Sequence, residues 1–212
     1  MMKGLLIKDL KLMRAQIVFF ALVPVVGAVF VVPAGEMSMG FGYITAISGL
    51  IGVTTINYDS YDNGFAYLFT LPISRRGYVK EKYIFATLSS VAVVMAIGLF
   101  MWALMAVSHP EAAYAFADFL GDMEDSYLIA LTAVAFMLPV FLKFGAEKSR
   151  FVILIIAGIF MGVMIGVSQA EALRDIELSG GHWVRVITPV LCLAWLCASY
   201  LISVRIMEKK EF

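Results

Sequence analysis

The sequence has 212 residues, of which 62% are hydrophobic and 15% are charged, with a mean hydropathy of +0.91. Ordinary soluble domains are about 45–50% apolar and about 25% charged, so this composition excludes a soluble globular protein and a disordered one. Sixteen basic and sixteen acidic residues leave no net charge, which gives no basic surface for nucleic acid.

The charged residues form clusters separated by long uncharged stretches, which is the pattern that a bilayer imposes. About 20 apolar residues cross a bilayer as a helix. The sequence therefore predicts an all-α membrane protein, a single transmembrane domain with six spans at about residues 15–35, 37–58, 83–108, 126–142, 151–169 and 186–204. Of the 16 basic residues, only Arg174 and Arg185 fall on one predicted side of the membrane, so both termini are predicted to be cytoplasmic.

Residues 1–14 are predicted to form an amphipathic helix on the membrane surface, because basic and apolar side chains take opposite arcs at helical spacing. Asp9 breaks this pattern by lying within the apolar arc. A carboxylate there needs a partner, either a basic residue of a cytoplasmic segment or a protein beneath the membrane. A contact with lysine head groups at a frayed helix end is the alternative.

The longest predicted cytoplasmic connection covers residues 59–82. Asp59 and Asp62 lie where a short helix is expected to start, since negative charge is favourable at a helix N-terminus. Ser74 is expected to cap a further helix whose four basic residues lie at the lipid head groups: Arg75, Arg76, Lys80 and Lys82. Between them runs an apolar and aromatic surface that indicates a binding partner, formed by Phe65, Tyr67, Leu68 and Phe69.

On the opposite side, a short outer helix is expected over residues 110–125. Its acidic residues recur at helical spacing, and they either attract cationic cargo or form a solvated cap between two spans. Gly158, Gly162 and Gly166 make a double G-x-x-x-G stripe in the fifth span, which predicts close packing against a helix of this chain or of another. Hydroxyl side chains in the second span either line a path or bond back to their own helix.

The predicted spans contain no Asp, Glu, Lys or Arg, and both histidines, His109 and His182, lie in outer segments. No catalytic, cofactor-binding or metal site is therefore expected, and there is no P-loop for ATP. If the protein moves a substrate uphill, another chain must supply the energy.

The amphipathic start with Lys8-Asp9-Leu10, the six spans, and the stretch LPISRRGYVKEKY at residues 71–83 together resemble the ABC-2 type permease family. The resemblance is closest to its small bacterial branch that exports peptides, bacteriocins and phenol-soluble modulins. It implies a subunit without enzymatic activity in the bacterial cytoplasmic membrane, exporting amphipathic peptides or other hydrophobic or toxic compounds. An assembly or structural membrane protein without transport activity is the alternative.

The resemblance also implies partners and roles. Two separate ABC ATPase subunits would bind ATP-Mg, and a second permease copy or a paralogue would complete a dimer. Lys8 and Asp9 would belong to an elbow helix, and 62–70 would be a coupling helix seated on the ATPase. The residues implied in ATPase coupling are Asp62, Phe65, Tyr67, Leu68, Phe69, Arg75 and Arg76.

Overall fold

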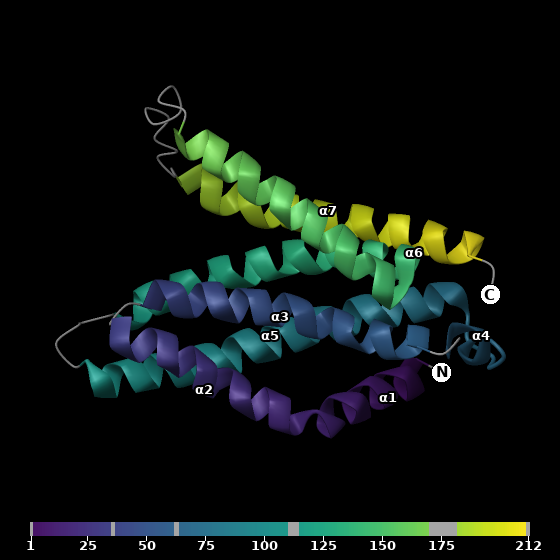
Figure 1. The fold of residues 1–212 in the computed structure, drawn as a ribbon, viewed down its shortest axis with the longest axis horizontal. Coiled ribbons are helices and arrows are strands. Elements are labelled where there is room, and N and C mark those ends of the chain that lie inside the picture. Colours follow the sequence, from purple (N-terminus) through teal and green to yellow (C-terminus); the bar gives the residue numbers. More distant parts are fainter. Residues whose placement is uncertain (1, 35–36, 62–63, 110–114, 170–181, 211–212) are drawn as a thin grey trace.

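The computed structural model describes residues 2–34, 37–61, 64–109, 115–169 and 182–210, without the side chains of 156–169, 182–186 and a few single positions. Within these ranges the fold is helical and contains no strand, which confirms the all-α prediction (Figure 1). The helices are α1 (Met2–Ala15), α2 (Ile17–Ala34), α3 (Met37–Ser60), α4 (Gly64–Leu68), α5 (Arg75–Ser108), α6 (Phe116–Gln169) and α7 (His182–Lys209).

Two groups of helices make up the bundle. Helices α2, α3, α5 and the first half of α6 lie side by side, and the second half of α6 runs along α7 (Figure 1). Helix α1 meets α2 at an angle of 62°. Both ends of the chain lie near the short helix α4, so we call this end of the bundle the α4 end (Figure 1).

The structure differs from the expected boundaries along α6. A separate outer helix over 110–125 is not seen, because the helix that begins at Phe116 continues directly through the expected fourth span. The polar connection expected after residue 142 is also helical, apart from one break at Gly145. Gly145 has a φ of +75°, in the left-handed region that costs other residues steric strain, so a glycine makes this sharp reversal possible.

Three helical segments among the described residues are long and apolar enough to cross a membrane: Arg75–Ser108, Phe116–Gly145 and Ile187–Lys209. The bent pair α1–α2 adds a fourth if it counts as one span. These segments support a membrane-embedded protein, while the number of six spans stays a prediction. Gly158, Gly162 and Gly166 belong to α6, but their packing lies outside the described side chains.

Buried apolar side chains form two clusters, one toward each end of the bundle. The cluster far from the α4 end joins α2, α3, α5 and α6 around Ile44, Met101 and Phe119. The cluster at the α4 end joins α1, α3, α4, α5, α6 and α7 around Tyr78, Leu138 and Met207. Six helices therefore meet at the α4 end, and this is where most of the buried charge of the described residues lies.

Candidate functional site

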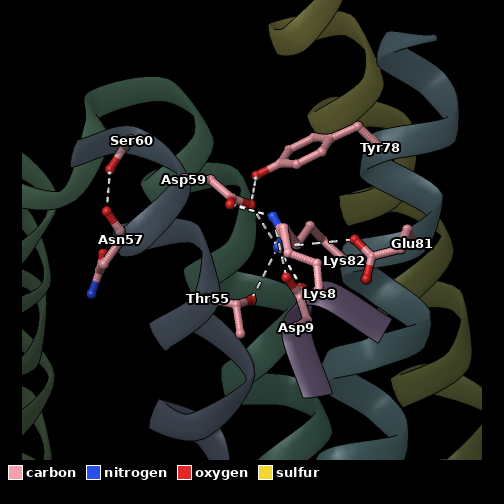
Figure 2. Close-up of polar contacts among 9 residues, drawn as sticks. All are labelled: Lys8, Asp9, Thr55, Asn57, Asp59, Ser60, Tyr78, Glu81 and Lys82. Atoms are coloured by element: carbon pink, nitrogen blue, oxygen red, sulfur yellow. Dashed lines mark hydrogen bonds and ion pairs between the residues drawn. The ribbon is translucent and has the colours of Figure 1, made fainter. Parts of the chain in front are cut away.

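Five charged residues from three helices gather at the α4 end of the bundle, and Figure 2 shows their side chains close together. We call them the charge cluster: Lys8 and Asp9 of α1, Asp59 of α3, and Glu81 and Lys82 of α5. The side chains of Asp9, Glu81 and Lys82 are fully buried, and that of Asp59 is 7% exposed. Since buried charges are costly unless they are paired, the arrangement of these groups decides how α1, α3 and α5 fit together.

Lys82 lies at the centre of the charge cluster. Its Nζ is 2.5 Å from Asp9 Oδ2 and 2.7 Å from Asp59 Oδ2, and it donates a hydrogen bond of 3.2 Å to Thr55 Oγ1. Its ammonium group has three donor hydrogens, so these contacts use all of them. One side chain of α5 thus holds both α1 and the end of α3.

Two further groups complete the surroundings of Asp59. Lys8 forms an ion pair with Asp59, and the Tyr78 hydroxyl donates a hydrogen bond of 2.9 Å to Asp59 Oδ2. Burial alone would raise the pKa of Asp59, but Lys82 and Lys8 outweigh it and lower that pKa below its ordinary value. Likewise, burial would lower the pKa of Lys8, but Asp59 and Asp9 raise it. Both groups are therefore charged at neutral pH.

The sequence left the partner of Asp9 open, and the structure shows that it is a basic residue of the 59–82 segment, Lys82. Two expectations nearby were wrong. Lys82 does not lie at the lipid head groups but is fully buried, and Asp59 does not start a short helix but lies in the last turn of α3. Glu81 was not predicted to belong to the site. A signal for it was present, because acidic and basic residues occur together in the segments expected on the same side of the membrane and can pair there.

Helix α4 packs one side onto the bundle and turns the other outward. The ring of Phe65 meets that of Tyr78 edge to face with 5.9 Å between centroids, and Leu68 is buried beside it. Phe69 contacts the same tyrosine at 5.8 Å. Tyr67, by contrast, is 75% exposed. The prediction that all four form one partner-binding surface is therefore wrong for Phe65 and Leu68, which α5 and its neighbours cover.

The C-terminal end of α7 closes the site from the other side. The Arg75 guanidinium donates to the carbonyl oxygens of Met207 and Glu208 at 3.0 and 2.8 Å, and Arg76 pairs with Glu208 at 2.5 Å. Lys210 donates to the Leu142 carbonyl at 2.8 Å, with its Nζ 4.9 Å from the Phe65 ring centre.

Both arginines expected to serve in ATPase coupling thus bind the end of α7, although the Arg76 side chain stays 74% exposed. Asp62, also expected to take part, lies outside the described residues. Among the residues that the structure describes, no three His, Cys, Asp or Glu side chains lie close enough to hold a metal ion. Ion pairs of the charge cluster join α1, α3 and α5, and ring contacts with Tyr78 attach α4 and the residue that follows it to α5.

These features define a helical membrane protein with a cluster of buried ion pairs at one end. Residues 4–208 match the family of ABC-2 family transporter proteins, and the chain belongs to this family. It is a membrane permease of an ABC transporter, a transport subunit and not itself an enzyme, and the family implies ABC ATPase subunits as partners. No significant match to a curated protein or to a solved structure is found.

Proposed function

We propose that this permease is the membrane subunit of an ATP-driven exporter in the bacterial cytoplasmic membrane. In this proposal two permease chains with six spans each, identical or paralogous, work with two separate ABC ATPase subunits that bind ATP-Mg. Helix α1 is the elbow helix, and α4 is the coupling helix. Both termini and α4 then face the cytoplasm, and the cargo is an amphipathic peptide or another hydrophobic or toxic compound.

The observation that carries this proposal is the position of α4. It is fixed to the bundle by Phe65 and Leu68, and it presents Tyr67 outward. A helix that receives force from an ATPase needs both properties, an exposed side for the partner and a rigid attachment behind it.

The contacts behind α4 offer a route for the movement. Phe65 and Phe69 press on Tyr78, Tyr78 bonds Asp59, and Asp59 pairs with Lys82. Lys82 in turn holds Asp9 of α1. A displacement of α4 therefore reaches α1, α3 and α5 together through direct contacts.

A groove between α3 and α6 supports the cargo class. Its volume is about 830 Å³, and apart from Thr45 and three polar residues of α6 its lining is apolar or small. The Thr45 hydroxyl bonds back to the Phe41 carbonyl at 2.7 Å, as the back-bonding alternative expects, so it exposes little polarity. An apolar wall with carboxylates toward one end suits an amphipathic, cationic molecule. The lining residues are Phe41, Gly42, Thr45, Ala46, Gly49, Leu50, Asp122, Asp125, Ser126, Ile129, Ala133 and Met137.

The first experiment is to tag the chain in its native cell, solubilise it gently and identify what co-purifies. We expect a stoichiometric P-loop ATPase and ATP hydrolysis that vanadate inhibits. A chain that purifies alone, or with a partner lacking a nucleotide site, would contradict the exporter proposal and favour an assembly protein.

The second experiment tests α4 in that complex. Tyr67→Ala is expected to lower cargo-stimulated ATP hydrolysis and transport while leaving the melting temperature unchanged, because Tyr67 makes little contact inside the chain. Val107→Ala is the control, since this residue is 81% exposed and lies at the far end of α5. Equal transport by the wild type and the Tyr67→Ala variant would show that α4 does not carry the coupling.

A further inference from the structure

The charge cluster is not balanced when every member is ionised. Asp9, Asp59 and Glu81 supply three negative charges, and Lys8 and Lys82 supply two positive ones. The sum is one negative charge in a region where three of the five side chains have no exposure at all. A net buried charge without compensation is strongly unfavourable, so one further positive charge would stabilise the cluster formed by these described residues.

Glu81 is the carboxylate that lacks a proper partner. Its Oε2 is 3.9 Å from Lys82 Nζ, a distance too long for a hydrogen bond, and neither of its oxygens has a hydrogen-bond partner among the described residues. Lys82 directs its donors to Asp9, Asp59 and Thr55 instead. One Asp9 oxygen, Oδ1, likewise lacks a hydrogen bond among the described residues, and it lies 3.3 Å from Lys8 Nζ.

The neighbouring elements supply no other partner for Glu81 in the contacts seen. Helix α1 brings Asp9 and Lys8, α3 brings Asp59, and α5 itself brings Lys82 and Tyr78 (Figure 2). Helix α2 has no ionisable side chain, α4 has no charged one, and the described lysines of α6 at this end, Lys143 and Lys148, are exposed. At the end of α7, Glu208 pairs with Arg76, and Lys210 bonds the Leu142 carbonyl.

A proton fits this position better than a metal ion. A cation near Glu81 would lie close to the Lys82 ammonium and would be repelled by it. A proton becomes part of the carboxyl group, removes the surplus negative charge, and gives Glu81 an O–H donor for a nearby acceptor such as the Asp9 carboxylate.

We propose that Glu81 is a proton-binding site that holds one proton at neutral pH and thereby locks the elbow helix α1 onto α5. With the proton in place the charge cluster is neutral, and α1 is held firmly. Release of the proton leaves a buried negative charge between α1 and α5 and weakens their contact. The permease then responds to pH through this single carboxyl group.

Infrared spectroscopy of the full-length permease in lipid tests the proposal directly. At pH 7 we expect a carbonyl stretch of a protonated carboxylic acid in the wild type, absent in Glu81→Gln and lost when the wild type is made alkaline. Glu208→Gln is the matched control, since the Glu208 side chain is 40% exposed and ion-paired, and it should leave the band unchanged. No such band in the wild type, or the same band in Glu81→Gln, would overturn the proposal.

Thermal unfolding supplies a second readout that needs neither ATP nor cargo, so it tests this site separately from the exporter function. The folded state binds one more proton than the unfolded state between the ordinary carboxyl pKa of about 4 and the higher pH at which folded Glu81 loses its proton. Over that range the folding constant of the wild type should fall by up to about tenfold per pH unit as the pH rises, and at higher pH this dependence should level off. Glu81→Gln, which is permanently neutral, should lose this dependence. Parallel pH profiles of the wild type and the variant would show that no proton is held there.

Discussion

Replacing Lys82 by methionine tests whether the charge cluster stabilises the bundle. Methionine keeps the length and the apolar part of the side chain but removes the ammonium group that holds Asp9 and Asp59. The two carboxylates then remain in a buried place with only Lys8 to balance them. Removing one partner of a buried ion pair typically costs about 3–5 kcal/mol, because the other charge is left uncompensated.

For a chain of this size such a loss corresponds to a fall in melting temperature of about 6–20 °C. The assay is thermal unfolding of the purified permease in detergent, at a pH where the wild type and every variant are soluble. Lys80→Met is the matched control, because Lys80 lies two residues away on the exposed side of α5, and its change should stay within about 0.5 kcal/mol.

A double variant makes the test more specific. Adding Asp9→Asn to Lys82→Met removes one of the uncompensated charges. The double variant should therefore lose less stability than the sum of the losses in Asp9→Asn and Lys82→Met alone. Equal melting temperatures for Lys82→Met and Lys80→Met would refute the reasoning, since they would mean that the central ammonium contributes nothing to folding.

Two further predictions concern stability. The pKa of Asp59 is lowered in the folded state, so its ionised carboxylate stabilises the fold. This stabilisation is complete above the ordinary pKa of about 4 and is lost as the pH falls below that value. The melting temperature of the wild type should therefore drop in this acidic range, and that of Asp59→Asn should drop less. Gly145→Ala should lower the free energy of unfolding by about 1–2 kcal/mol, because Gly145 has a positive φ. Gly121→Ala should instead raise it by up to about 1 kcal/mol, since Gly121 is helical and an added Cβ would meet open space. Melting temperatures of both glycine variants check this contrast, and equal effects would show that the reversal at residue 145 does not need a glycine.

Much of the fold follows from the pattern of charge and hydropathy. Long uncharged stretches are helices because a bilayer leaves the backbone no other way to pair its polar groups. The breaks between helices were harder to predict, because a single glycine such as Gly145 can reverse the chain within a segment that has helical propensity throughout. The outer helix was misplaced for a related reason, since acidic residues on an exposed face do not mark where a helix stops.

The candidate site was predictable only in part. The misplaced Asp9 indicated a missing partner, and α5 supplied it. Which basic residue would be buried was not predictable, because Lys80 and Lys82 look alike in sequence and differ only in the face of α5 that they occupy. Similarly, Phe65 and Tyr67 differ in exposure because a five-residue helix has one side against the bundle.

The contacts of Met207, Glu208 and Lys210 with Arg75, Phe65 and Leu142 have a consequence for biosynthesis. Arg75 and Met207 are 132 residues apart in the sequence, so the support that α7 gives to the α4 end can form only after α7 has been synthesised. The earlier helices can therefore enter the bilayer while the α4 end of the bundle is still unfinished. Closure of this end reports that α7 has reached its place against α5 and α6.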